Sequence, residues 1–419
     1  MRKFVAVLLI PLLFLAACGG GGGYGGGGGG PPPPTGQTIA PPGPPNVETL
    51  TVEAGPAGSI NTAFVSVKVC APGSTTTCKT IDHIEVDTGS TGLRIISTVL
   101  SAAPALTLPA EMDGSGHPFA ECLQFADGTA WGSLATADIT LPVSGETAAG
   151  VHVHVIGDPT YPTVPPSCTG NPENTVQQFG ANGILGVGPF LQDCGPACVA
   201  AGTPFPVYYS CPTPGTCSPA NASLMQQVPN PATLFATDNN GVIVELPSVG
   251  SVGAATASGS LVFGIGTRTN NALGSATVLL ADPNTGFITS TYKGTAFTGG
   301  YLDSGSNANF FTDSSIGACA SPNQGFYCPG STLSETATLK GSGASTITAN
   351  FSVGDAVQTF NAYPNYTAFS SIAGKIPNPP PAGQPQPFDF GLAFFYGRNV
   401  FTAIENANTP GGIGPYFAF

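Results

Sequence analysis

Two short stretches of nearly the same sequence stand in opposite halves of the chain. Residues 84–90 read IEVDTGS and residues 300–306 read GYLDSGS. Each stretch sets an aspartate at the end of a strand-like run and follows it with a hydroxyl residue, a glycine and a serine. The two aspartates, Asp87 and Asp303, are 216 residues apart. This spacing predicts one aspartate loop in each half of the molecule.

The residue types in these stretches suit acid and base catalysis. Gly89 and Gly305 allow a tight turn that presents the preceding carboxylate, and the hydroxyls and amides of such a turn can hold an ionised carboxylate. If the fold brings Asp87 and Asp303 together in a cleft, the two carboxyls cannot both ionise easily. They then share a proton, so that one acts as base and the other as acid on a single water.

The elements that must position these loops are short strands. From Val47 onward, β-rich runs are separated by clusters of Gly, Pro, Asn and Ser, and residues 63–69 and 241–246 alternate in polarity. Little of the chain shows a helical period, and 419 residues are enough for two lobes. We therefore expect an all-β protein with few short helices, built of an N-terminal lobe at 47–239 and a C-terminal lobe at 240–419.

Composition excludes several other classes of protein. A net charge of −13 leaves no basic patch to neutralise phosphates, so nucleic acid is not an expected partner. The 58 Gly and 42 Pro residues would suit disorder, but 41% hydrophobic residues, with 25 Phe and 11 Tyr, can bury a large core. No GxSxG, HExxH or Walker motif occurs, so a serine-hydrolase elbow, a zinc-protease helix and a phosphate loop have no support. We expect neither a metal nor a cofactor.

An ordered set of further segments accompanies the two aspartate loops, and with it the chain resembles the pepsin-like, two-lobed aspartic peptidases. The segments that carry the resemblance are 91–93 after the first aspartate, 125–138 as the flap hairpin, 183–188 as the first support element, 259–264 as the strand opening the second lobe, and 390–405 as the closing segment. They follow one another in the family's order over most of residues 60–419, at low identity. The resemblance implies the pepsin-like acid-protease fold, with one catalytic Asp loop per lobe.

Carried over position by position, the resemblance implies that Asp87 and Asp303 are the catalytic dyad that grips the nucleophilic water. The residues implied to support the dyad are Thr88, Gly89 and Ser90 in the first loop and Ser304, Gly305 and Ser306 in the second. The first hydroxyl of each loop would bridge to the other loop, and the serine would hydrogen-bond the outer carboxylate oxygen. In that mechanism there is no covalent intermediate and no metal.

The flap departs from the family pattern. Phe125, Gly128 and Trp131 belong to the implied flap and substrate surface, but Phe125 stands where most relatives have tyrosine. The tryptophan that usually partners this tyrosine is replaced by Arg94, which is either a substrate-carboxylate contact or a partner of a local acidic group. The Trp131 indole N–H either replaces the hydrogen bond of the missing tyrosine hydroxyl, or the ring only packs in the hairpin. The second support element falls at 391–393 or, in the alternative alignment, at Phe390-Gly391.

The first residues read as an export signal. A basic head precedes the apolar run 4–15, and residues 15–19 (LAACG) resemble the bacterial lipobox, in which the chain is cut before a cysteine that becomes lipidated. We expect a signal peptide at 1–17, lipidated Cys18, and a Gly/Pro-rich tether at 18–46. An ordinary secretory signal with a chance cysteine is the alternative. The glycine after Cys18, in place of a retaining aspartate, favours the outer membrane by resemblance.

The ten remaining cysteines are an even number in an exported chain, which predicts disulfides. Close pairs such as Cys70/Cys78, Cys211/Cys217 and Cys319/Cys328 could clip hairpins or loops, but the connectivity stays open. Zinc is the competing use of the pair Cys194/Cys198.

Two histidines and the first strand complete the expectations. His152 and His154 lie two apart on a strand-like run, so both should point to one face, which we expect to be a polar, solvent-facing surface rather than a metal site. The segment from Val47 either joins the sheet between the lobes or is a removable strand.

Taken together, these observations predict a membrane-anchored aspartic endopeptidase that hydrolyses peptide bonds. It should be a monomer, lipid-anchored in the bacterial cell envelope, with a protein or peptide substrate. The rival is a non-catalytic pepsin-like binding protein or envelope scaffold that holds a peptide or envelope ligand between the lobes. Intact aspartate loops favour the enzyme because a binder has no need for two apposed carboxyls. The altered flap favours the binder.

Overall fold

The structure is a computed structural model that describes residues 37–126, 128–200, 206–377, 379–381 and 383–419. The expected signal peptide at 1–17, the lipidation of Cys18 and the tether up to residue 36 lie outside the described residues. The prediction of a tether is wrong for residues 37–46, because this segment is bonded to the C-terminal lobe: Ala40 N–H donates to Glu245 Oε2 at 2.6 Å, and Asn46 Nδ2 donates to Phe263 O at 2.7 Å. Within the described part of the chain, no helix combines the length and the apolar character needed to cross a membrane.

The larger of the two main sheets has 15 strands and runs through both lobes. In spatial order its strands are β10 (Ser218–Pro219), β9 (Tyr208–Ser210), β5 (Phe119–Gln124), β6 (Thr129–Thr140), β7 (Thr147–Ile156), β4 (Thr91–Ile96), β8 (Gly183–Val187), β3 (Cys78–Asp87), β2 (Ala63–Cys70), β1 (Val47–Val52), β12 (Ala257–Phe263), β11 (Gly241–Leu246), β21 (Arg398–Ala403), β24 (Tyr416–Ala418) and β13 (Val278–Leu280).

The second sheet has seven strands and belongs to the C-terminal half. In spatial order these are β18 (Thr346–Val353), β17 (Leu333–Lys340), β14 (Ile288–Tyr292), β15 (Thr295–Leu302), β20 (Pro387–Phe390), β16 (Asn309–Phe310) and β19 (Ala373–Gly374). A small ribbon pairs β22 (Asn408–Thr409) with β23 (Gly412–Ile413).

Helices are few and short in the described residues. The α-helices are α1 (Ser97–Ser101), α2 (Val176–Phe179), α3 (Ala356–Ala362) and α4 (Leu392–Phe395), and the 3-10 turns are η1 (Gly55–Ala57), η2 (Gly195–Cys198), η3 (Pro231–Leu234) and η4 (Thr269–Asn271). The prediction of an all-β chain with few short helices is confirmed.

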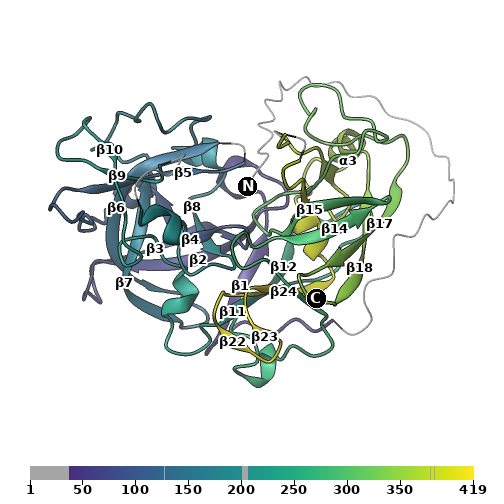
Figure 1. Ribbon diagram of the computed structural model, residues 1–419, viewed down its shortest axis with the longest axis horizontal. Coiled ribbons are helices and arrows are strands. Elements are labelled where there is room, and N and C mark those ends of the chain that lie inside the picture. Colours follow the sequence, from purple (N-terminus) through teal and green to yellow (C-terminus); the bar gives the residue numbers. More distant parts are fainter. Residues whose placement is uncertain (1–36, 127, 201–205, 378, 382) are drawn as a thin grey trace.

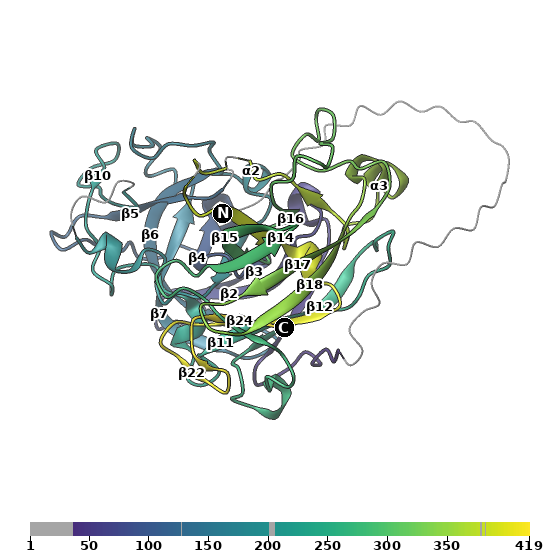
Figure 2. The same ribbon diagram turned by 45° about the vertical axis from the view of Figure 1, so that its right-hand side comes forward.

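The sheets form two lobes that meet in the middle of the molecule (Figure 1). Strands β2 to β10 form the lobe on the left of the view, and β14, β15, β17 and β18 lie in the lobe on the right. The turned view shows the second sheet from its broad side (Figure 2). Each lobe carries one of the two Asp loops. The predicted all-β architecture of two lobes, with one Asp loop in each, is therefore what the structure has.

Strand β1 joins the two lobes. It pairs with β12 along its whole length, from Val47 opposite Val262 to Val52 opposite Ala257, and with β2 where Thr51 lies opposite Phe64. Of the two readings left open for this segment, the structure has the strand of the shared sheet. Removal of β1 would expose the backbone edges of both neighbouring strands.

The two lobes have cores of different chemistry. The first is built mainly of Val, Ile and Leu side chains, whereas the second is rich in aromatic rings. Phe311 and Phe388 stack with ring centroids 4.7 Å apart, and Phe388 and Phe390 lie 4.6 Å apart. Phe388 and Phe390 lie on the same side of β20, because successive side chains of a strand point to opposite faces.

The same local arrangement positions both Asp loops. β3 runs parallel to β8, with Val86 opposite Leu185, and ends in the first loop. β15 runs parallel to β20, with Leu302 opposite Phe390, and ends in the second loop. Because Phe390 is the last residue of β20, the second support element ends at Phe390-Gly391. The placement at 391–393 is wrong, since residues 392 and 393 already belong to α4.

All ten cysteines considered above pair in the structure. The disulfides are Cys70–Cys78, Cys122–Cys168, Cys194–Cys198, Cys211–Cys217 and Cys319–Cys328. The expectation of disulfides is confirmed, and the three close pairs bridge as considered. Cys194 and Cys198 bind each other, so these two thiols are not zinc ligands here.

Candidate active site

The two Asp loops face each other and are tied together by their hydroxyl residues. The backbone N–H of Thr88 donates to Ser304 Oγ at 3.1 Å, and the N–H of Ser304 donates to Thr88 Oγ1 at 3.0 Å. Each hydroxyl in turn donates to a carbonyl across the junction, Thr88 to Leu302 at 3.2 Å and Ser304 to Val86 at 2.8 Å. These four bonds satisfy buried polar groups from both lobes, so neither loop is complete without the other.

Each aspartate is held by its own loop in the same way. In the first loop Gly89 N–H donates to Asp87 Oδ1 at 2.7 Å, and Ser90 Oγ donates to Asp87 Oδ2. In the second loop Gly305 N–H donates to Asp303 Oδ1 at 2.8 Å. Ser306 Oγ lies 3.2 Å from Asp303 Oδ2. The two donors on Asp87, and the Gly305 N–H on Asp303, fix the orientation of the carboxyls and favour their ionised forms.

The glycines of the two loops are needed for close approach rather than for an unusual turn. Both glycines lie in turns, as expected, and neither has a positive φ angle. A Cβ on Gly89 would instead lie 2.4 Å from Asp303 Cγ, and a Cβ on Gly305 would lie 2.6 Å from Asp87 Cγ. Each carboxyl thus packs against the backbone of the opposite loop.

Burial and mutual proximity set the charge of this pair. The side chains of Asp87 and Asp303 are both fully buried. Burial, and next the neighbouring charge of Asp87, raise the pKa of Asp303 well above its usual value. Because two adjacent buried carboxyls cannot both ionise, the pair holds one proton across a wide pH range. The arrangement can therefore supply one acid and one base to the same small molecule.

The hairpin of β5 and β6 carries the residues expected to form the flap. At its end Phe125 N–H donates to Gly128 O at 2.8 Å. The Phe125 ring packs edge-on against Phe179 at 5.8 Å, within an apolar cluster that includes Ile96 and Ile184. A Cβ on Gly128 would lie 2.4 Å from the Glu173 carboxyl carbon, so a side chain has no room there.

Trp131 does not belong to a substrate surface. Its side chain is 2% exposed, its indole N–H donates to Tyr161 O at 2.9 Å, and its ring packs edge-on against Tyr209 at 5.2 Å. It lies in a cluster with both sulfurs of Cys122–Cys168. The assignment of Trp131 to the flap and substrate surface is wrong, because the indole is already satisfied inside the lobe.

Arg94 is not a substrate contact either, because its side chain is completely buried. Its Nη2 lies 2.7 Å from Glu121 Oε1 and 3.1 Å from Asp193 Oδ2. Burial alone would raise the pKa of Glu121, but the charges of Arg94 and of His154 hold it well below its usual value. Tyr208 donates to Asp193 Oδ1 at 2.5 Å. Of the two readings of Arg94, the structure has the pairing with local acidic groups.

The expected solvent-facing position of His154 is wrong for the same reason. Its ring is fully buried, and its Nδ1 lies 3.0 Å from Glu121 Oε2. His152 is closer to the surface and lies 3.4 Å from Glu111 Oε2. The register of β4 and β7, which sets Arg94 opposite His154, brings the histidine into the charged cluster.

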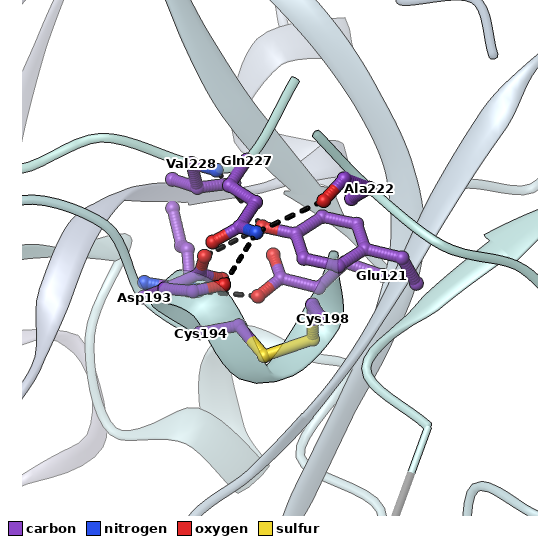
Figure 3. Close-up of a disulfide and its surroundings, with 10 residues drawn as sticks. Glu121, Asp193, Cys194, Cys198, Ala222, Gln227 and Val228 are labelled. Atoms are coloured by element: carbon purple, nitrogen blue, oxygen red, sulfur yellow. Dashed lines mark hydrogen bonds and ion pairs between the residues drawn. A yellow bond between two sulfur atoms is a disulfide. The ribbon is translucent and has the colours of Figure 1, made fainter. Parts of the chain in front are cut away.

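A disulfide borders this cluster. Figure 3 shows Asp193 and Glu121 beside the Cys194–Cys198 bridge. Gln227 Nε2 donates to Gly195 O at 2.8 Å and to Ala222 O at 3.1 Å, so it closes the loop over the acidic side chains. Burial, and next the charge of Glu121, raise the pKa of Asp193 well above its usual value.

Comparison with known proteins gives a family. The chain matches the family model described as "Protein of unknown function (DUF3443)" over residues 42–419. The chain belongs to this family. No curated protein matches it in sequence. Among the solved structures, the crystal structure of aspartic proteinase from Irpex lacteus is 16% identical, and the match covers 89% of this chain and 96% of that chain with a TM-score of 0.49.

One buried acid near the dyad was not expected from the sequence. Asp389 on β20 is 3% exposed, and Ser306 Oγ donates to its Oδ2 at 2.6 Å. The sequence does contain a signal for Asp389, because it stands between Phe388 and Phe390. An ionisable side chain in an apolar strand is rarely buried without a partner. Within the described residues, no group of three or more side chains could hold a metal ion.

Proposed function

We propose that this chain is an aspartic endopeptidase that hydrolyses peptide bonds with a water held between Asp87 and Asp303. The observation that supports the proposal is the mutual packing of the two loops, in which each carboxyl lies against the glycine of the opposite lobe. Two acids buried against each other cost stability, and a role in acid and base catalysis accounts for keeping both.

The proposed reaction needs only these two groups and a water. Asp87, ionised and held by two donors, takes a proton from the water as the oxygen attacks the peptide carbonyl carbon. Asp303, which burial keeps protonated, gives its proton to the carbonyl oxygen. Asp87 then passes the proton to the amide nitrogen, the C–N bond breaks, and the hydroxyl proton returns to Asp303 as the carboxylic acid forms. Water is consumed, and both carboxyls end as they began.

The cellular setting belongs to the same proposal. Lipidation at Cys18 would tether the chain to the bacterial envelope, with the outer membrane favoured, and its substrate would be a protein or peptide in that compartment. We expect the enzyme to act as a monomer, because one chain supplies both Asp loops.

The second candidate is a binding protein or envelope scaffold that uses the same region without catalysis. Phe125 favours it, because its ring packs in an apolar cluster and carries no hydroxyl that could bond to a substrate or a partner. Arg94 points the same way, because it is taken up by Glu121 and Asp193.

Cleavage of a mixed peptide library by the full-length chain, from about pH 3 to about pH 8, tests the proposal. The expected result is cleavage by the parent that pepstatin inhibits, with loss in both Asp87→Asn and Asp303→Asn. Asp355→Asn is the matched control, because Asp355 caps α3 and asparagine caps a helix equally well. A folded parent that binds peptides but cleaves none would support the binding protein instead.

A further inference from the structure

Asp389 lies directly behind the second Asp loop. On β20 the rings of Phe388 and Phe390 enter the aromatic core, and alternation along the strand turns Asp389 to the opposite face. There its Oδ2 accepts from Ser306 Oγ at 2.6 Å, while its Oδ1 has no hydrogen-bond partner among the described residues. A buried carboxyl that is only half satisfied needs an account.

Ser306 is shared between two acids. Its Oγ lies 2.6 Å from Asp389 Oδ2 and 3.2 Å from Asp303 Oδ2. A hydroxyl carries one proton and so donates to one oxygen at a time, although it can accept from a second group. Whether Ser306 donates to Asp303 therefore depends on whether Asp389 is a competing acceptor or a donor.

The surroundings of Asp389 favour its protonated form. The titratable groups that face it are Asp303 and Asp87 of the dyad and Tyr301 of β15. No described Lys, Arg or His forms an ion pair with it. Burial raises the pKa of Asp389 well above its usual value, against the opposing effects of the Ser306 and Tyr301 hydroxyls, and the charge of Asp87 raises it further.

We propose that Asp389 is a positioning residue that acts on the dyad through Ser306. In its protonated form it donates to Ser306 Oγ, which turns the Ser306 proton toward Asp303 Oδ2 and stabilises the negative charge that Asp303 acquires when it acts as acid. When Asp389 ionises, Ser306 turns to Asp389, and Asp303 loses this donor. The proton that Asp389 loses passes to the solvent, while the Ser306 hydroxyl keeps its own proton and only rotates, so the switch needs no further reactant.

The effect on catalysis rests on the proposed function, and the pH profile of kcat tests it. Asp389→Asn keeps an N–H donor toward Ser306 at every pH. We expect kcat near the wild-type value at acid pH and an alkaline limb moved up by about one pH unit, an about tenfold gain at the alkaline end. In Ser306→Ala, which has no hydroxyl to turn, Asp389→Asn should leave the profile unchanged. Asp355→Asn is again the matched control, and it should leave the pH profile of kcat unchanged.

A second readout does not need activity. Between the ordinary pKa of an aspartate and the raised pKa of Asp389, the folded chain holds a proton that the unfolded chain has lost. The free energy of unfolding of the wild type should therefore fall as the pH rises through this window. Asp389→Asn, or Asp389→Leu if the amide prevents folding, should lessen this fall.

The outcomes separate the two proposals. An active wild type whose pH profile coincides with that of Asp389→Asn would overturn the role of Asp389 and leave the peptidase intact. If the wild type is inactive, the proposed function fails. The Asp389–Ser306 coupling is then tested by unfolding: a change in pH dependence on Asp389→Asn that differs between the wild-type and Ser306→Ala backgrounds would support it, and equal changes in both backgrounds would overturn it.

Discussion

The two lobes use their buried charges in different ways. In the first lobe Arg94, Glu121, Asp193 and His154 form one cluster in which a cation neutralises the acids. In the second lobe Asp389 is buried without a cation among the described residues, next to the loop that carries Asp303. The first arrangement stabilises a lobe, and the second places a buried acid in contact with Ser306 of the candidate active site.

The strands behind the loops show where this difference arises. By the parallel registers of β8 with β3 and of β20 with β15, Ile184 of the first lobe corresponds to Asp389 of the second. Ile184 lies in the apolar cluster that holds Phe125, whereas Asp389 contacts Ser306. The two loops make the same contacts with each other, but they make different contacts with the lobes that carry them. The two halves therefore share one loop geometry, and we propose that in the second half this geometry is coupled to Asp389.

Breaking the charged cluster of the first lobe should have the largest effect on stability. Arg94→Met leaves Glu121 and Asp193 buried without their cation, which should lower the free energy of unfolding by about 4 kcal/mol. Urea unfolding measures this. The control is Lys340→Met, which removes the charge of an exposed residue of β17 and should change the free energy of unfolding by about 0.5 kcal/mol or less. Equal losses in the two variants would contradict the balanced cluster.

The likeness of the two loops is tested by their glycines. Gly89→Ala and Gly305→Ala should each force the opposing carboxyl away, at about 2–3 kcal/mol of stability and at least about 100-fold in peptidase rate. Gly114→Ala is the control, because nothing lies within 4 Å of its Cβ. If one of the two loop variants kept full activity, the mutual packing would not be symmetric in function.

The hydroxyl bridge should give a smaller, coupled effect. Thr88→Val and Ser304→Ala each leave a backbone N–H of the other loop without its acceptor, which should cost about 2 kcal/mol. The double variant should lose less than the sum, because both changes break the same set of bonds. Strict additivity in a double-mutant cycle measured by urea unfolding would show that the two hydroxyls act separately.

A buried acid far from both loops should give the smallest effect and serves as a reference for Asp389. Burial raises the pKa of Glu245 to about 7, so its folded form binds a proton that the unfolded chain releases from pH 4.5 upward. Stability should fall between pH 4.5 and about 7, and Glu245→Gln should reduce this fall by on the order of 1 kcal/mol. The alkaline limb of kcat should stay in place in this variant. A shifted limb would mean that remote acids also tune the dyad.

Much of the fold was predictable because its signals are local. Alternating polarity and frequent turn residues predict strands, and the two stretches around Asp87 and Asp303 read as strands that end in loops. The position of Phe390-Gly391 was less certain from the sequence, since a support strand is recognised by its parallel partner. Its pairing with β15 settled the register.

The roles of Arg94, Trp131 and His154 could not be predicted, because each depends on neighbours distant in the sequence. Arg94 and His154 meet Glu121 only through the order of β4, β5 and β7 in the sheet. Trp131 finds its acceptor at Tyr161 in a connecting loop. A polar or aromatic residue in a strand looks the same in the sequence whether its lobe buries or exposes it.

The sequence by itself determined the all-β character, the two aspartate loops and the supply of cysteines, because strand pattern, turn residues and motif are properties of neighbouring residues. Only the tertiary structure decided what surrounds each loop. It set Gly89 against Asp303 and Gly305 against Asp87, and it placed Asp389 behind Ser306. The physical reason is that close approach and desolvation depend on all the chain that packs around a group, and here that chain comes from both lobes.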